Sequence, residues 1–371
     1  MTSSSAFASL PAPRSTSFSR RFDLRLPLVQ GPMLGASTPA LAAAVSNAGG
    51  LGFIAVSALA PEKLASEVAA LRALTSKPFG VNLFVQDVAR PDDATVRRAL
   101  SAIDPLRAQF DLPPGAPLAA YAPDFRAQLD TLVDLRVPVV SFTFGLLGKE
   151  DVARLHAAGS YVIGTATHVA EALAWRDSGA DAIVAQGAEA GGHRGTFIGD
   201  VAHALIGTMA LVPQVVDATG LPVLAAGGIM DGRGIAAALA LGAQGVQMGT
   251  AFLGCVESAI AADWKARLRT SADTATSVTR AITGRHARGI RNPLMMQLEA
   301  RAETVAPYPV QNALTQELRQ RAARANDGDW LSLWSGQGAP LSRVREAGIG
   351  AAQLVEAIDA EWRAALRSFH A

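Results

Sequence analysis

The stretch Asp181-Ala-Ile-Val-Ala-Gln-Gly-Ala-Glu-Ala-Gly-Gly-His-Arg194 joins a short strand, a glycine-rich loop and a histidine. Residues 181–185 predict a strand that is buried on both faces, as in parallel sheets. Gln186 ends this strand, and the glycines after it let the backbone approach a ligand closely. His193 follows, and histidine is the side chain whose unperturbed pKa lies closest to neutrality. The pattern predicts either a cofactor loop with an acid–base residue or a tight turn with a solvated histidine.

Composition excludes several classes of protein. The chain has 371 residues, half of them hydrophobic, and a net charge of +1, which suits one large α/β domain with an elaboration. Balanced charge gives no indication of nucleic acid or an anionic membrane as partner, and no apolar run reaches the ~20 residues of a membrane span. The single cysteine, Cys255, excludes an internal disulfide and a multi-cysteine metal site. We expect a metal-free, cytoplasmic protein, either a monomer or a homodimer, with Cys255 as a buried inert thiol.

The N-terminal segment has a different composition from the rest. Residues 1–21 are rich in Ser, Pro and Ala, contain three arginines and lack acidic residues. Both an organelle transit peptide and a disordered extension have this composition. Two prolines interrupt the segment and no convincing amphipathic helix is visible, so we favour a disordered extension over residues 1–22.

From Leu24 onward, apolar strands alternate with helices. The predicted strands are residues 26–30, 52–56, 79–84, 137–143, 161–165, 181–185, 222–226 and 245–248. Eight βα units predict a (β/α)₈ TIM barrel. The alternative is an open doubly wound sheet, which usually begins with Gly-x-Gly-x-x-Gly after its first strand. The residues Gly31-Pro32-Met33 do not match that motif.

The remaining segments indicate how the chain is divided. We expect the barrel to occupy residues 23–260, with a polar, helical insertion at about 87–135. Residues 261–345 are helical and irregular, and we interpret them as a lid over the mouth of the barrel. Residues 346–371 predict a C-terminal helix that packs back on the barrel.

Residues capable of chemistry fall where the predicted strands end, which is where barrel active sites lie. These residues are Met33, Asn82, Thr143, Thr165, Gln186, Gln247 and Thr250. Each alone can simply end a strand, but their concurrence favours a site. The loops Ala226-Gly-Gly228 and Gln247-Met-Gly-Thr250 also predict a phosphate site, because glycine N–H groups and a helix N-terminus bind anions. Two ordinary tight turns are the alternative.

Several motifs together resemble the nitronate monooxygenase family, formerly called 2-nitropropane dioxygenase. They are Gln30-Gly-Pro-Met33, Gln186-Gly-Ala-Glu-Ala-Gly-Gly-His-Arg-Gly195, Ala225-Ala-Gly-Gly-Ile229, Gln247-Met-Gly-Thr250 and Trp334-Ser-Gly-Gln337. The resemblance runs from about Leu24 to the end of the chain. Related FMN-dependent enoyl reductases share parts of these motifs, so the superfamily is more firmly indicated than the subfamily.

The resemblance implies an FMN-binding barrel with a helical second domain. It implies FMN contacts at Pro32, Met33, Leu34, Asn82, Gln186, Gly191, Gly228, Gln247, Met248, Gly249 and Thr250. It further implies that the enzyme uses O₂ to oxidise alkyl nitronates, and also nitroalkanes, to a carbonyl compound and nitrite. Propionate 3-nitronate is one candidate substrate. His193 is then the base that removes the α-proton, or else protonated His193 or Arg194 holds the nitronate oxygens.

Two other functions fit the same residues. One is an NAD(P)H-dependent FMN reductase acting on a quinone or an enoyl thioester, although the sequence contains no separate dinucleotide motif. The other is a non-catalytic protein that binds a phosphate ligand. A histidine within the cofactor loop argues against this second alternative.

Overall fold

Eight parallel strands close into a barrel in the computed structural model, which describes residues 15–86 and 91–368. The strand order is β1-β9-β8-β6-β5-β4-β3-β2, and a bridge from Val29 to Leu51 closes it. The strands are β1 (Leu28–Gln30), β2 (Gly52–Ala55), β3 (Phe79–Phe84), β4 (Val139–Thr143), β5 (Tyr161–Ala166), β6 (Ala182–Gln186), β8 (Val223–Ala226) and β9 (Gly245–Met248). The predicted (β/α)₈ barrel is confirmed.

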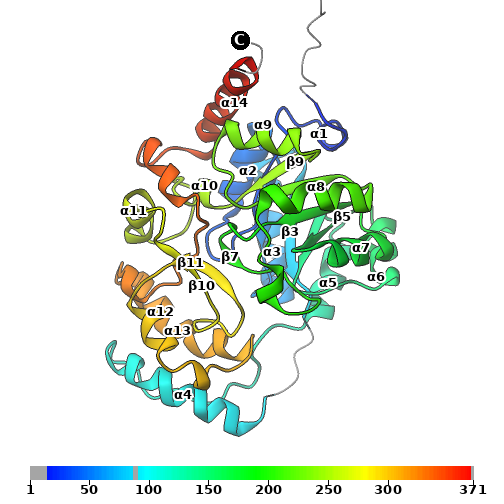
Figure 1. The fold of residues 1–371 in the computed structure, drawn as a ribbon. Helices are drawn as coiled ribbons and strands as arrows, with labels where there is room; N and C mark the ends of the chain where they lie inside the picture. Colours follow the sequence, from blue (N-terminus) through cyan, green and yellow to red (C-terminus); the bar gives the residue numbers. More distant parts are fainter. Residues whose placement is uncertain (1–14, 87–90, 369–371) are drawn as a thin grey trace, which may run out of the picture.

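Helices surround the barrel on its outside (Figure 1). They are α2 (Pro39–Asn47), α3 (Pro61–Leu74), α5 (Phe125–Asp134), α6 (Lys149–Ala157), α7 (Val169–Ser178), α8 (Thr208–Thr219) and α9 (Gly232–Ala240). The start of α2 follows from its sequence: Thr38 accepts a hydrogen bond from the Leu41 N–H, and Pro39 takes the first helical position. The interior of the barrel is packed with side chains. Gly80 makes room there, because a Cβ at this position would lie 2.1 Å from the Phe53 ring.

A short helix, α1 (Ser17–Arg21), covers the N-terminal end of the barrel. Phe18 and Phe22 are buried and pack edge-on against each other and against Tyr161. The expected disordered extension is therefore wrong for residues 15–22, because this pair of aromatic side chains docks on the barrel. Residues 1–14 lie outside the described residues.

The predicted insertion divides between two parts of the molecule. Helix α5 lies against α3 on the barrel, and Gln128 donates to the Leu59 carbonyl at 2.7 Å. Helix α4 (Asp93–Ala108) instead packs with α12 (Pro293–Glu299) and α13 (Val310–Arg324) around a separate apolar core (Figure 1). Residues 87–90 of the insertion lie outside the described residues.

The region beyond residue 260 also contains strands, which the sequence analysis missed. Strands β10 (Thr276–Thr279) and β11 (Ala287–Ile290) form an antiparallel pair, and β7 (Gly192–His193) adds a third strand. The expectation of purely helical and irregular structure was wrong here, because such short strands lack a measurable alternation of apolar residues. Pairing of Ala287 with His193 ties this region directly to the glycine-rich loop.

The remaining elements complete the fold. The C-terminal helix α14 (Ala351–Ser368) packs on α9 and α2. Shorter helices are α10 (Thr250–Leu253), α11 (Ala262–Thr270), η1 (Val201–Ala204), η2 (Ala302–Thr304), η3 (Gly328–Trp330) and η4 (Ala339–Val344). Within the described ranges, no helix is long and apolar enough to cross a membrane.

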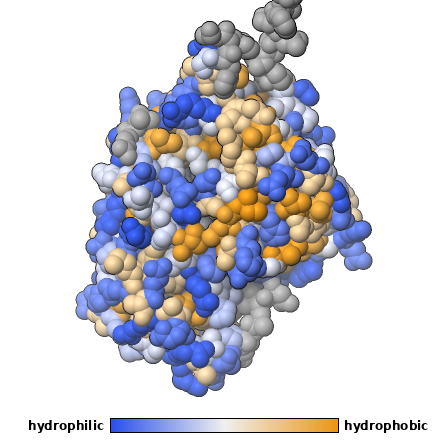
Figure 2. Space-filling model, in the orientation of Figure 1, coloured by the Kyte–Doolittle hydropathy of each residue, from blue (hydrophilic) through white to orange (hydrophobic). Residues whose placement is uncertain are grey.

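The outer surface is mostly mixed in polarity. Figure 2 shows an apolar band across the region of α8 on the face it displays. Exposed apolar side chains from this part of the chain are Ile198, Leu205 and Met209. The choice between a monomer and a homodimer stays a prediction.

Candidate active site

A deep cavity opens at the C-terminal ends of the barrel strands, where the second apolar core meets the barrel. It encloses about 1360 Å³ of empty space, counting its opening to solvent. The predicted site residues that line it are Pro32, Met33, Leu34, Asn82, Gln186, Gly191, His193, Gly228, Gln247, Gly249 and Thr250. Met248 does not line it, because its side chain is buried in the core between strands and helices. The structure therefore brings the scattered motifs together at one place.

The loop after β1 is held by a buried glutamine. Gln30 accepts a hydrogen bond from the Phe53 N–H at 3.0 Å and donates to the Ser37 hydroxyl at 2.9 Å. The same hydroxyl accepts from the Met33 N–H at 2.9 Å. Residues 31–33 are thus fixed along one wall of the cavity.

Polar side chains at the ends of β3, β4 and β5 form another part of the wall. Asn82 donates to the carbonyl of Ser141 at 3.1 Å and to its hydroxyl at 3.0 Å. The hydroxyls of Thr143 and Thr165 are 3.3 Å apart. Four neighbouring polar residues line the cavity here, in a position to meet the polar edge of a bound ring.

The glycine-rich loop is closed by the side chain of Gln186. Its amide donates to the His193 carbonyl at 2.9 Å and accepts from the Gly195 N–H at 2.8 Å. The loop also crosses the Trp334-Ser-Gly-Gln segment very closely. A Cβ on Gly191 would lie 2.4 Å from the Gly336 nitrogen, so only glycine fits at this crossing.

The two glycine loops predicted to hold a phosphate meet at one end of the cavity. Gly228 has a φ of 75°, and the N–H groups of Gly228 and Gly249 have no hydrogen-bond partner within the described chain. The Thr250 hydroxyl accepts from the Gly336 N–H at 2.9 Å, which leaves its own hydrogen free to donate. These unpaired donors fit a phosphate group.

His193 lies inside a cage of aromatic rings. The ring centroids of Phe84, Phe144, Tyr308 and Trp334 are 6.2, 5.4, 5.7 and 5.6 Å from that of the imidazole. Burial, together with the positive charges of Arg285 and Arg319, lowers the pKa of His193 to about 3. The imidazole is therefore neutral at pH 7, and the alternative of a solvated histidine in a turn is wrong.

The hydrogen bonds around His193 assign its tautomer. Its Nε2 lies 2.9 Å from the Thr283 hydroxyl, and this hydroxyl donates to the Arg285 carbonyl at 3.2 Å. Because the single hydroxyl hydrogen is used in that way, Nε2 carries the imidazole proton. Nδ1 is left as the basic nitrogen.

Two cavity residues on α13 escaped the sequence analysis. Arg319 donates to the Asn312 carbonyl and amide oxygen, both at 2.8 Å, and to the Ser332 hydroxyl at 3.0 Å. Its Nε is buried without a partner, and burial lowers the Arg319 pKa to about 10, so it remains a cation at pH 7. The available signal was their spacing of seven residues, which puts both on one face of a helix.

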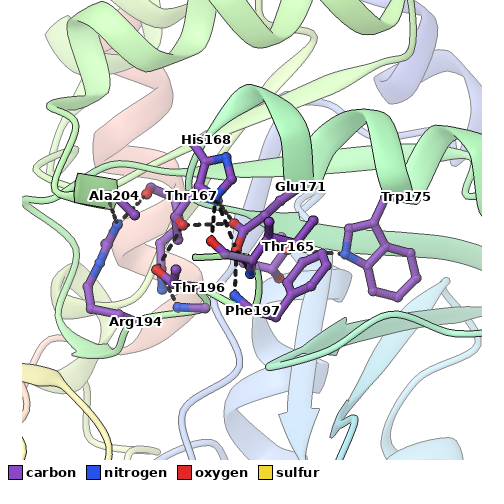
Figure 3. Close-up of polar contacts among 12 residues, drawn as sticks. Thr165, Thr167, His168, Glu171, Trp175, Arg194, Thr196, Phe197 and Ala204 are labelled. Carbon is purple, nitrogen blue, oxygen red and sulfur yellow. Dashed lines mark hydrogen bonds and ion pairs between the residues drawn. The ribbon is translucent and has the colours of Figure 1, made fainter. Parts of the chain in front are cut away.

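The segment after His193 is fixed from behind by a buried carboxylate (Figure 3). Glu171, on α7, accepts from the Thr167 N–H and hydroxyl at 2.7 and 2.8 Å. It also accepts from the N–H groups of Phe197 and Ile198. This carboxylate therefore ties α7 to the loop that carries His193.

Arg194 has a structural position and not the anion-binding one that we expected. Its side chain is fully buried and donates to the carbonyls of Gly187 and Gln186 at 2.6 and 2.9 Å. It also donates to the carbonyl of Ala204 at 3.2 Å (Figure 3). It does not line the cavity. Its guanidinium braces the loop and does not face a substrate.

Comparisons with known proteins agree with this geometry. The family model for nitronate monooxygenase matches residues 16–361. A probable nitronate monooxygenase of Staphylococcus haemolyticus is 41% identical over 91% of this chain and 95% of its own. A solved structure of nitroalkane oxidase from Streptomyces ansochromogenes is 40% identical, with a TM-score of 0.85 over 95% of this chain and 99% of that chain. FabK from Thermotoga maritima is 31% identical, with a TM-score of 0.74 over 96% and 98%.

The family model and the relative each cover most of the chain, and the motifs that carried the resemblance all lie around one cavity. The resemblance seen in the sequence is therefore confirmed. The chain belongs to the nitronate monooxygenase family, whose members are flavin-dependent oxidoreductases.

Proposed function

We propose that this enzyme uses FMN and O₂ to oxidise alkyl nitronates to a carbonyl compound and nitrite. The observation that carries the proposal is one cavity with unpaired phosphate donors at one end and a neutral histidine among fixed cations at the other. The family and the resemblance to a nitroalkane oxidase support the same reaction class.

The residues present fit FMN. Gly228, Gly249 and Thr250 would hold its phosphate, whereas Asn82 and Gln186 would contact the ring system. One phosphate end is formed, and no second phosphate-binding motif was found in the sequence, which favours FMN over FAD. FMN, when bound, supplies the electron transfer and the reactivity toward O₂.

The charges in the cavity favour an anionic substrate. Arg319 lines the cavity with an unpaired Nε, and no carboxylate among the described residues is found to act on its charge. A nitronate carries its negative charge on the nitro oxygens, so this guanidinium and the Asn312 amide would bind and orient it.

His193 would act on a neutral nitroalkane. Its Nδ1 can take the α-proton, which a nitronate has already lost. A base whose pKa is held near 3 accepts that proton with little driving force. We therefore propose the nitronate as the better substrate and the nitroalkane as the slower one.

The test uses the purified enzyme without added reductant. Mass spectrometry of the released flavin should identify FMN, and O₂ uptake with nitrite release should be faster with a nitronate than with its parent nitroalkane. A protein that cannot be loaded with FMN overturns the cofactor. NADH oxidation with a quinone or an enoyl thioester, without nitronate turnover, would identify the reductase instead.

A further inference from the structure

Phe144 adopts a backbone conformation that its residue type disfavours. It follows the end of β4 and has a φ of 84°, in a region that bulky side chains rarely occupy. Strain of this kind persists where the surroundings enforce it, and it concentrates at functional sites. This conformation accompanies a ring that stacks on Phe84 at 4.1 Å and meets His193 nearly perpendicularly, at 84°.

Arg285 lies over the same ring. Its guanidinium carbon is 3.9 Å from the centroid of Phe144, well within the range of a cation–π contact. It comes from the loop between β10 and β11, and its Nε donates to the Arg194 carbonyl at 3.3 Å. A second donor binds the Thr196 carbonyl. The two carbonyls belong to the segment that directly follows His193, so Arg285 is fixed relative to the imidazole.

We propose that Arg285 and Phe144 form a positioning pair that fixes both the ring plane and the charge environment of His193. Phe144 is the wall against which the imidazole rests, and Arg285 is the charge held behind that wall. Arg285 and Phe144 were not among the residues that the family motifs identified.

Other groups facing His193 do not cancel this charge. Thr283 and Arg285 face it from the β10–β11 loop, Tyr308 from the segment before α13, and Arg319 from α13. Burial raises the pKa of Tyr308 to about 12, so the phenol is neutral. Among the described residues, the charges that act on the imidazole are those of the two arginines, and both oppose its protonation.

The pair has a consequence for the reaction, and this step rests on the proposed function. Keeping His193 neutral preserves its Nδ1 lone pair at every working pH. It also prevents a second cation from forming beside the anionic substrate. As a consequence, His193 is a weak base, and this makes the enzyme selective for substrates that are already deprotonated.

The test follows the imidazole directly and needs no turnover. The flavin-loaded enzyme is labelled with ¹³C and ¹⁵N at its six histidines, and the His193→Asn variant identifies the signal of His193. In the unmodified enzyme we expect His193 to stay neutral, protonated at Nε2, down to the lowest pH at which the protein remains folded. Arg285→Met should raise its pKa by about 1–2 units, the usual effect of one nearby charge.

Two matched variants separate charge from packing. Arg285→Lys keeps the charge, so the pKa of His193 should stay close to that of the unmodified enzyme. Phe144→Leu removes the wall, so the His193 resonance should lose the contribution of Phe144 to its ring-current shift and broaden. If Arg285→Met does not fold, Arg285→Gln, which also removes the charge but keeps hydrogen-bond donors, takes its place with the same expected rise in the His193 pKa.

The inference is overturned if Arg285→Met leaves the His193 pKa unchanged, or if Arg285→Lys raises it equally. An unaltered His193 resonance in Phe144→Leu also overturns it. These outcomes are independent of the proposed function, because a shifted pKa in an enzyme that does not oxidise nitronates supports the pair and contradicts only the reaction.

Discussion

The two ends of the cavity are built in opposite ways. The phosphate end is formed by short loops that directly follow β8 and β9, with one contact from the segment at Gly336. The His193 end draws residues from β3, the end of β4, the β10–β11 loop, α13 and Trp334. The first end depends on local backbone conformation, whereas the second depends on packing between distant segments. Loss of one glycine should therefore abolish ligand binding at the first end, whereas a single substitution should only reduce the function of the second end.

The largest expected effect is at the phosphate end. Gly228→Val places a branched side chain at a φ of 75°, where it strains the backbone and blocks the approach of a phosphate. We expect FMN to be lost during purification while circular dichroism still reports the native barrel.

Gly220→Val is the matched control. Gly220 has a φ of 65° at the end of α8, and a Cβ there meets nothing within 4 Å. Both variants bear similar backbone strain, so equal loss of flavin in both would mean that Gly228 serves only its turn.

The contrast between the two ends also explains what the sequence could predict. Gly228, Gly249 and Thr250 were found because strand, glycine and helix are adjacent in the chain. Asn312 and Arg319 reach the cavity, and Arg285 reaches the Phe144 ring, through contacts that span many tens of residues, and a single sequence contains no signal for such contacts. The positive φ of Phe144 is likewise invisible, since nothing in its residue type predicts it.

Arg194 shows that neighbours in the sequence can also mislead a prediction. Its place next to His193 in the sequence predicted a place beside the substrate. Successive residues of an extended segment point to opposite faces, and the structure turns Arg194 away into the loop it braces. Proximity in the chain identified the right loop but the wrong face.

The second effect concerns His193 as a base. His193→Asn should lower turnover of a neutral nitroalkane by roughly 10²-fold, the low end of the usual contribution of a general base because the imidazole is a weak one, and change nitronate turnover far less. Oxygen consumption with both substrates measures this in variants shown to retain flavin. His203→Asn, at an exposed position, is the control, and full nitroalkane activity in His193→Asn would contradict the assignment.

The third effect concerns anion binding at Arg319. Arg319→Gln removes the cavity cation, and we expect the KM for a nitronate to rise roughly 10–100-fold, as for loss of a charged hydrogen bond. The kcat should change less, because the interaction holds the substrate before and during the reaction. Arg324→Gln, exposed at the end of the same helix, should leave KM unchanged. An effect of equal size in both variants would assign the change to the helix and not to the cavity.

The smallest effect is a dependence of stability on pH, and it follows from the neutral state of His193. The pKa of His193 is lowered to about 3 in the folded protein, against about 6.5 in the unfolded chain. Between these values the unfolded state binds one more proton than the folded state, so the free energy of unfolding falls as pH falls below about 6.5. The His193→Asn variant has no imidazole at this position, so it lacks this difference in proton binding between the two states.

We therefore expect the stability of the unmodified enzyme, relative to His193→Asn, to decrease by about 1 kcal/mol between pH 7 and pH 5.5. Urea unfolding of both proteins at the two pH values measures the difference, with free FMN held at one concentration because bound ligand also stabilises the fold. A difference that does not change with pH would mean that His193 titrates alike in the folded and unfolded states. The cage of aromatic rings and the two arginines would then not keep the imidazole neutral, and the weak-base explanation for a preference for nitronates would lose its foundation.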